Sequence, residues 1–190
     1  MPAPRMRLRT RGWGRASDDR CVAYEWVDSL EAYCFTAAVG LSPAEAVRRL
    51  HGVPAVARRT FAECFWPAAG PQWAQLGTVD GGLLVAEHNG WRAEEAVERL
   101  SAGARVACFV RDVHAVMRFV YAIDGRIVAD FDPLLDREPP RRLEPALHGL
   151  SFGLFTAETS ALQALERLTG VRVARSWLDT PQRCVTLPPL

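Results

Sequence analysis

The sequence lacks lysine altogether and has very little asparagine and isoleucine. All 23 basic residues are arginine, and 22 acidic residues leave a formal net charge of +1. A nearly neutral chain has no general electrostatic attraction to nucleic acid or to anionic membranes. The missing lysine indicates a GC-rich coding sequence more than a selected chemistry, so the abundance of arginine does not by itself indicate a binding function.

The sequence also has no apolar segment for membrane insertion or export, and its cysteines show no pattern of disulfide bonding. No apolar run approaches the roughly 20 residues that span a bilayer, and the basic N-terminus lacks the apolar stretch of a signal peptide. The five cysteines are an odd number without a CxxC pair, which is typical of free, mostly buried thiols in a reducing cytosol. We therefore expect a cytoplasmic protein. A flexible basic arm over residues 1–20, with six arginines, precedes a single α+β domain over residues 21–190.

The segment Leu83–Leu100 predicts the unit around which the chain is organised. Its first four residues are apolar and suit a buried strand, and Gly90 then breaks the run. Apolar residues recur at helical spacing after the break, at Ala93, Ala96, Val97 and Leu100. This spacing predicts a strand, a glycine turn and an amphipathic helix.

The same plan occurs once before, 50 residues upstream. There Tyr33–Gly40 is followed by Leu41–Gly52, and six of the eleven residues 40–50 are identical to residues 90–100. Because an alanine- and arginine-rich chain raises chance identity, we interpret this as a repeated structural solution and leave ancestral duplication open. Ser42 and Glu45 form a capping box, which predicts that the first helix begins there.

Two Asp-Gly pairs between apolar runs predict β-hairpins, because such two-residue turns require positive φ. They are Asp80-Gly81 and Asp124-Gly125. The run Val106–Val110 is apolar on both faces, which is typical of an interior strand. The predicted fold class is α+β, with one antiparallel or mixed sheet of five to seven strands and helices mainly on one face.

Three other segments give no strand signal. Val53–Pro71 is rich in proline and alanine, and we expect only a short helix around Phe61–Trp66. Asp132–Pro145 contains four prolines and is expected to be a surface loop. Val171–Leu190 is expected to be a tail with a helical fragment near Trp177.

Several stretches resemble a family of uncharacterised actinobacterial proteins that is defined only as a domain of unknown function. They are Tyr33–Gly40 with its capped helix, EHNGW around Asn89, YAIDGRIVADFDP, and ALQALERLTGVRVARSWLDTP. The resemblance spans about Trp26 to Pro188 and implies a cytoplasmic, single-domain protein. It implies no activity, cofactor or catalytic residue. His88 stands where the family favours proline, so we place no site on this histidine alone.

Motifs for nucleotide binding and covalent catalysis are absent. The turn glycines belong to no GxGxxG or GxxxxGK pattern, and no GxSxG elbow exists. A thiol nucleophile would be Cys34 or Cys108, with His88 or His114 as its base. Both cysteines lie in apolar runs, where burial raises the thiol pKa and makes the thiol inert.

Acidic and histidine side chains at strand ends leave metal binding as an alternative. Carboxylate and imidazole ligands suit several divalent ions, but no pair has a recognised spacing among Glu87, His88, His114, Asp130 and Asp132. Asp130 and Asp132 face the same way on a strand, whereas a carboxylate pair that flanks a substrate normally comes from different segments. We assign no metal ligand, cofactor or catalytic residue.

The candidate partner- or ligand-binding residues are Glu87, His88, Asn89, Trp91 and His114. Asn89 can form the turn before the helix, and Trp91 can serve either as an interface anchor or as a staple at the helix start. The favoured hypothesis is a non-enzymatic protein-binding or regulatory module, of the immunity type, whose partner is another protein.

Two other functions are weighed against this one. The alternative is a small-ligand-binding protein or enzyme that uses a strand-end pocket near Glu87, His88 and His114. Nucleic-acid binding through the N-terminal arginines is a third hypothesis and predicts binding that weakens with salt. The sequence makes no prediction of the oligomeric state.

Overall fold

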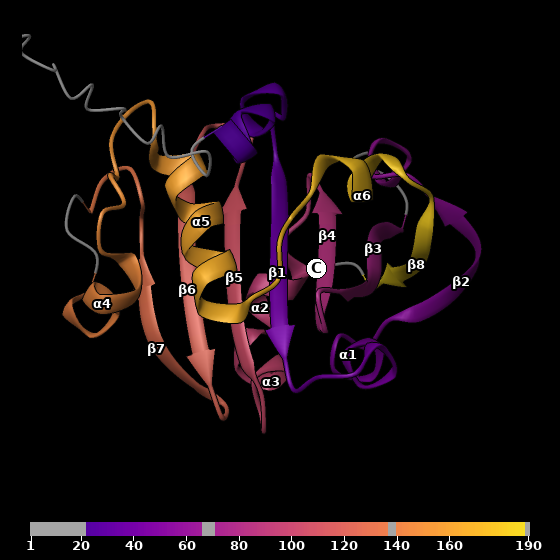
Figure 1. Ribbon diagram of the computed structural model, residues 1–190. Helices are drawn as coiled ribbons and strands as arrows, with labels where there is room; N and C mark the ends of the chain where they lie inside the picture. Colours follow the sequence, from indigo (N-terminus) through magenta and orange to yellow (C-terminus); the bar gives the residue numbers. More distant parts are fainter. Residues whose placement is uncertain (1–21, 66–70, 137–139, 189–190) are drawn as a thin grey trace, which may run out of the picture.

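The fold is built on an eight-stranded antiparallel sheet with the strand order β2-β8-β3-β4-β1-β5-β6-β7 (Figure 1). The computed structural model describes residues 22–65, 71–136 and 140–188. The strands are β1 (Tyr33–Val39), β2 (Val53–Arg59), β3 (Gln72–Val79), β4 (Gly82–His88), β5 (Arg105–Arg111), β6 (Met117–Ile123), β7 (Arg126–Phe131) and β8 (Gln182–Leu187). The predicted N-terminal arm lies outside the described residues.

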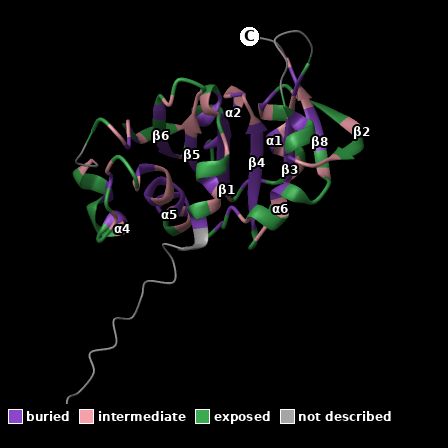
Figure 2. Cartoon of the chain, turned by 90° about the horizontal axis from the view of Figure 1, so that it is seen from above, coloured by how far each residue is buried: buried purple, intermediate pink, exposed green. Residues whose placement is uncertain are grey.

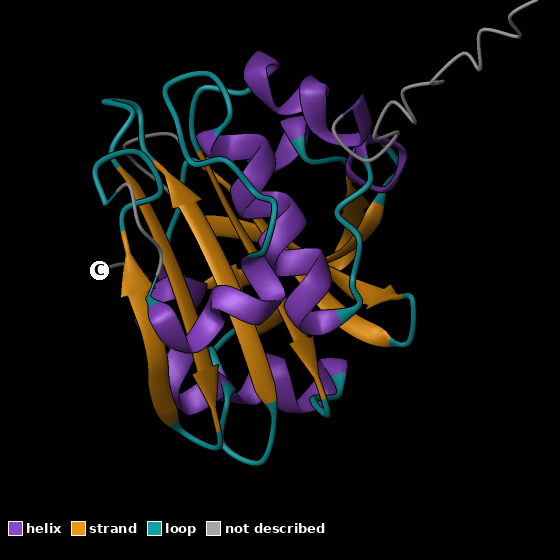
Figure 3. Cartoon of the chain, turned by 60° about the vertical axis from the view of Figure 1, so that its left-hand side comes forward, coloured by secondary structure: helices purple, strands orange, loops and turns teal. Residues whose placement is uncertain are grey.

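Helices cover both faces of the sheet. The α5 face carries 3-10 helices η1 (Val22–Ser29), η2 (Ala62–Cys64) and η3 (Arg141–Leu143) and α-helices α4 (Glu144–Leu147), α5 (Ala157–Thr169) and α6 (Arg175–Asp179). The α3 face carries α1 (Pro43–Arg49), α2 (Arg92–Glu95) and α3 (Val97–Leu100). Figure 2, which views the molecule from above, separates α4, α5 and α6 from α1 and α2. In Figure 3, α5 runs across its face of the sheet.

Alternation along the central strands divides the core between these two faces. In β1, Phe35 and Ala37 pack beneath α5, whereas Cys34 and Ala38 pack beneath the helices of the α3 face. Successive residues of a strand point to opposite faces, so an interior strand with a covering on each side is apolar throughout. The predicted interior strand follows this rule, because Phe109 and Cys108 lie in different clusters.

The predicted sheet of five to seven strands is wrong, and so is the placement of helices mainly on one face. The sheet has eight strands, and the prediction fell short because it lacked β2 and β8. The broad α+β class is right. β2 gave no signal because most of its side chains are exposed on both faces, and Pro54 lies within it. β8 lies in the segment that was expected to be a tail.

The predicted turns and cap are confirmed. The two Asp-Gly turns join β3 to β4 and β6 to β7, and all four residues have positive φ, at Asp80, Gly81, Asp124 and Gly125. The hydroxyl of Ser42 accepts a hydrogen bond from the Glu45 amide at 3.2 Å, which is one half of the predicted capping box; the Glu45 carboxylate instead accepts from Arg48 and Arg49. Local turn and cap chemistry therefore fixed these element boundaries.

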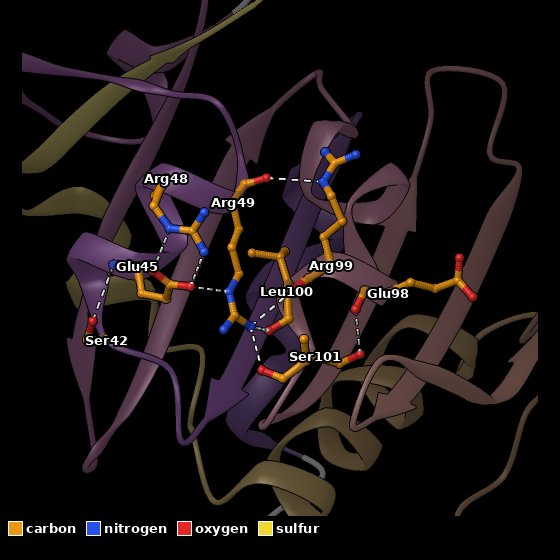
Figure 4. A network of polar contacts seen from close by, with 9 residues as sticks. Ser42, Glu45, Arg48, Arg49, Glu98, Arg99, Leu100 and Ser101 are labelled. Carbon is orange, nitrogen blue, oxygen red and sulfur yellow. Dashed lines mark hydrogen bonds and ion pairs between the residues drawn. The ribbon is translucent and has the colours of Figure 1, made fainter.

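The two copies of the strand–glycine–helix plan lie side by side. β1 and β4 are antiparallel neighbours, and both following helices lie on the α3 face. Arg49 at the end of α1 donates from Nη1 to the carbonyl of Arg99, and Arg99 donates from Nε to the carbonyl of Arg49 (Figure 4). The relation does not extend to the next strands, because β5 pairs with β1 whereas β2 lies at the far edge of the sheet.

Candidate functional site

The candidate residues lie along one rim of the sheet, here called the upper rim. It is formed by the strand ends at Tyr33, His88, Arg111, Met117 and Phe131, which the strand registers align. It lies at the top of Figure 1. The structure brings the predicted residues to this rim but divides them between the two faces of the sheet.

Glu87 is fully buried and supports the start of α2. Its carboxylate accepts hydrogen bonds from the backbone amides of Arg92 at 2.9 Å and Ala93 at 2.8 Å, and from the side chain of Gln72. Gly90 makes this arrangement possible, since a Cβ there would lie 1.9 Å from Gln72 Nε2. Burial raises the pKa of Glu87 to about 7, against the lowering effect of the amide donors. This carboxyl therefore positions the first turn of α2 by binding its backbone amides.

His88 points to the opposite face from Glu87, because the two are consecutive on β4. Its ring stacks on Phe61 with the centroids 4.6 Å apart and meets the edge of Phe65 at 5.0 Å. Burial lowers the pKa of His88, so the neutral ring predominates in this aromatic stack. The next residue, Asn89, has φ 57° and forms the left-handed turn that the sequence suggested.

Trp91 lines a groove on the α3 face, between α2 and the end of the β5–β6 hairpin. The groove has a volume of about 210 Å³ and is lined by Trp91, Glu94, Val110, Asp112, Val116, Met117 and Arg118. His114 is exposed in the loop 112–116 that forms one wall. Of the predicted residues, the structure thus brings Trp91 and the His114 loop together, while Glu87 lies behind α2.

The groove loop is held in shape by Asp112. One oxygen of its carboxylate accepts hydrogen bonds from the amides of His114 and Val116, both at 2.8 Å. Ala115 takes a left-handed conformation with φ 59° within the same turn. This local network fixes the wall of the groove without using the imidazole of His114.

An ion-pair network borders the groove. The guanidinium of Arg118 pairs with both oxygens of Asp130, at 2.9 and 2.7 Å, and with Glu94. Burial raises the pKa of Glu94, and the charge of Arg118 opposes this shift. Asp112 also lines the groove, so three carboxylates and one guanidinium lie at its border, which carries a net negative charge.

Exposed apolar side chains gather along the upper rim. Val113 and Val116 are in the groove loop, and Leu135 follows β7. Leu154 and Phe155, which is 90% exposed, lie just before α5. Phe152 packs on Phe131 at the end of β7, and Glu158 pairs with Arg111 at the end of β5, so the segment between them also lies at this rim.

The residues considered for metal binding and for thiol catalysis do not come together in the part of the chain that the structure describes. No set of three or more His, Cys, Asp or Glu side chains there is arranged to hold a metal ion. Cys34 and Cys108 lie beneath the α3 face with their sulfur atoms 3.5 Å apart, and burial raises the pKa of Cys34. Of the two bases considered for them, His88 points to the other face of the sheet and His114 is exposed in the loop 112–116.

The sequence did not reveal the groove itself. Val110 belongs to the predicted interior strand, and Met117 and Arg118 belong to the run before Asp124-Gly125. Their convergence with α2 depends on the strand order. The one available signal was a pair of valines, Val113 and Val116, in a turn segment that otherwise needs no apolar residue. The exposure of Leu154 and Phe155 had no signal, since apolar residues before a helix commonly pack into the core.

The fold and groove define an α+β protein with one antiparallel sheet and a small groove beside α2. The chain belongs to the family of unknown function DUF6461, whose model matches residues 20–188. Comparison with curated proteins and with solved structures gave no match. Within the described residues, no helix combines the length and apolar character needed to cross a membrane.

Proposed function

We propose that this protein is a non-enzymatic protein-binding module, of the regulatory or immunity type, whose partner docks on the upper rim. The observation that carries this proposal is the gathering of exposed apolar side chains at one rim, at Val113, Val116, Leu135, Leu154 and Phe155. Apolar residues scattered singly over a surface need no explanation, but a group at one place marks an interaction site. We further propose an actinobacterial, cytoplasmic setting, on the resemblance of the sequence alone.

The size of the groove favours a protein side chain as its occupant. Pockets for small ligands usually measure about 300–1,000 Å³, whereas this groove has a volume of about 210 Å³. A space of that size accepts one apolar side chain from a partner surface. Trp91 and Val110 line it, as expected for the central anchor of an interface.

The charges at the groove specify the chemistry of the partner. Glu94, Asp112 and Asp130 outweigh Arg118, so a partner with an arginine or lysine beside its apolar anchor is complementary. Complementary charge of this kind speeds association and selects among partners more than it increases affinity. We therefore propose a partner segment with one aliphatic or aromatic anchor next to a basic residue.

The alternative small-ligand site near Glu87, His88 and His114 has less support. Glu87 and His88 point to opposite faces of the sheet, and His114 is exposed in a loop beyond both. The polar atoms of Glu87 are engaged by the start of α2. A thermal-shift screen with divalent metals, nucleotides and common metabolites tests this alternative, which predicts a shift that His114→Ala abolishes.

The proposal is tested by affinity capture with the full chain and two matched variants. The rim variant carries Val113→Asp and Phe155→Asp, both at exposed positions. The control carries Val56→Asp, a fully exposed valine on the edge strand β2. We expect a protein that is retained by the wild type and the control and lost by the rim variant, with calorimetric titration of the purified partner confirming direct binding.

The outcome that contradicts the proposal is equally specific. If wild type and rim variant retain the same proteins, the upper rim is not the docking surface. Circular dichroism and unfolding midpoints of the variants exclude a folding defect as the cause of lost binding. For a bound partner, amide exchange must slow in residues 112–116 and 153–156, because these segments carry the exposed side chains.

A further inference from the structure

A second pair of thiols lies on the α5 face, away from the groove. Cys64 of η2 and Cys184 of β8 are both buried, and their sulfur atoms are 3.7 Å apart. A disulfide has a sulfur–sulfur distance of about 2.05 Å, so the two atoms need to approach by roughly 1.7 Å. The chain thus places two thiols within reach of a disulfide, although 120 positions separate them in the sequence.

The surroundings of this pair are polar and carry a positive charge. Gln75, opposite Cys184 in the sheet, donates from Nε2 to the carbonyls of Arg59 at 2.9 Å and Leu178 at 3.1 Å, and its buried Oε1 has no partner in the described residues. The guanidinium of Arg59 lies 4.3 Å over the ring of Trp73. This packing holds a permanent cation close to the thiols.

The two thiols differ in acidity. The hydrogen bond from Cys64 lowers the pKa of Cys184 against the raising effect of burial, and Arg59 lowers it further. The same sulfur–sulfur contact, followed by burial, raises the pKa of Cys64. A thiolate is the nucleophile in thiol oxidation, so Cys184 is the attacking residue and Cys64 the resolving one.

We propose that Cys64 and Cys184 are a redox-active dithiol that closes to a reversible disulfide on exposure to a peroxide. The Cys184 thiolate attacks one peroxide oxygen, the O–O bond breaks, and a sulfenic acid and hydroxide form. The Cys64 sulfur then attacks the sulfenic sulfur and releases a second hydroxide, which takes the Cys64 proton and leaves as water. In total, two thiols and one hydrogen peroxide give one disulfide and two waters.

The position of η2 provides access to the pair. It is a single turn at the surface, with Ala62 and Glu63 exposed and Phe65 52% exposed. Displacement of this one turn uncovers Cys184 without breaking the sheet. A disulfide then ties the turn, and with it the Phe61–His88 stack, to β8.

Cys34 and Cys108 form a natural comparison within the same chain. Their sulfur atoms are even closer, at 3.5 Å, but both residues lie on interior strands beneath α2 and α3. Thr36 donates a hydrogen bond to Cys108, and burial raises the pKa of Cys34. Proximity is therefore similar in the two pairs, while access and acidity differ, and the proposal requires Cys34 and Cys108 to stay reduced.

The test is peptide mapping of the full chain after treatment with hydrogen peroxide. Reduced protein is treated, its remaining thiols are blocked with N-ethylmaleimide, and non-reduced digests are analysed by mass spectrometry. We expect a cross-linked peptide pair that contains Cys64 and Cys184 and disappears on reduction with dithiothreitol. Consumption of thiols without this cross-link, or earlier linkage of Cys34 to Cys108, overturns the proposal.

Variants separate the roles of the two cysteines. Cys64→Ala leaves a sulfenic acid on Cys184 that dimedone traps, whereas Cys184→Ala leaves Cys64 unlabelled. Arg59→Gln slows oxidation several-fold, while Arg58→Gln, one position earlier on β2, leaves the rate unchanged. If dimedone labels Cys64 in the Cys184→Ala variant as fast as it labels Cys184 in the Cys64→Ala variant, the assignment is wrong. Unchanged unfolding midpoints of the reduced variants show that the effects are chemical.

Discussion

Arg49 and Arg99 exchange hydrogen bonds across the two copies of the strand–glycine–helix plan. Arg49 Nη1 donates to the carbonyl of Arg99 at 3.1 Å, and Arg99 Nε donates to the carbonyl of Arg49 at 3.2 Å. The two residues are equivalent at the offset of 50 positions. Two like charges can lie close together here because each guanidinium faces the last carbonyls of the other helix, where the helix dipole is negative.

Replacing Arg49 with alanine is expected to destabilise the protein by about 2 kcal/mol, the scale of hydrogen bonds from a charged donor. Its Nη1 also reaches the carbonyls of Leu100 at 2.8 Å and Ala102 at 2.7 Å, which the variant leaves without this donor. The control is Arg48→Ala, because Arg48 is exposed and pairs only with Glu45 in the described contacts. Urea unfolding measures both, and equal losses would contradict the assignment.

The stability of the protein is expected to fall as the pH rises from about 4.5 to about 7, in part because of Glu87. Burial raises the pKa of this carboxyl from 4.5 to about 7 in the folded state, so the folded protein binds a proton that the unfolded chain releases. The contribution is complete below pH 4.5 and is lost as the pH passes 7, and its size is about 3 kcal/mol. Unfolding free energies across this range must fall less steeply for Glu87→Gln than for wild type; parallel curves would refute the prediction.

Gly90→Ala is expected to cost about 2 kcal/mol, because the new Cβ displaces Gln72 and removes a donor from buried Glu87. A Cβ at this position meets Gln72 Nε2 at 1.9 Å and Glu87 Oε2 at 3.0 Å. A double-mutant cycle with Gln72→Ala checks the cause. In the Gln72→Ala background the same substitution should cost less than half as much, and simple additivity would rule this explanation out.

Tyr24→Phe is expected to destabilise the protein by about 1–2 kcal/mol, since it leaves a carboxylate on α5 without its donor. The hydroxyl of Tyr24 in η1 donates to Glu166 at 2.6 Å, and the ring itself is buried. The packing of the ring is kept in phenylalanine, so the loss reports the hydrogen bond. Denaturant unfolding in wild-type and Glu166→Gln backgrounds is the measurement, and a loss of equal size in both backgrounds contradicts the pairing.

Elements with local chemistry of their own were predictable from the sequence. The Asp-Gly turns require positive φ, the Ser42 cap requires an adjacent amide, and β5 requires two covered faces, and each of these requirements appears in neighbouring residues. The fragment near Trp177 is helical as expected, in α6. Thr156 occupies the N-cap position of α5 without a capping hydrogen bond, because its hydroxyl donates to the carbonyl of Ser151 and accepts from the amide of Gly153.

Features that depend on strand order were not predictable. β2 has no buried face to impose alternation, so it appears as a strand only once β8 is placed beside it. The candidate site shows the same division. Asn89 was identified as a turn residue from its own chemistry, whereas the groove beside Trp91 forms only because β6 lies two strands from β1. Glu87 and His88 were predicted to share one site, but consecutive residues of a strand point to opposite faces of the sheet.

The insertion of β8 between β2 and β3 has a consequence for biosynthesis. β8 ends at Leu187, and it is the strand that joins β2 to the rest of the sheet. During synthesis, β2 and the outer side of β3 must therefore wait until residues 182–187 have emerged from the ribosome. Such distant pairing is slow, so the emergence of β8, more than that of β2 itself, sets the moment at which this part of the protein can assemble.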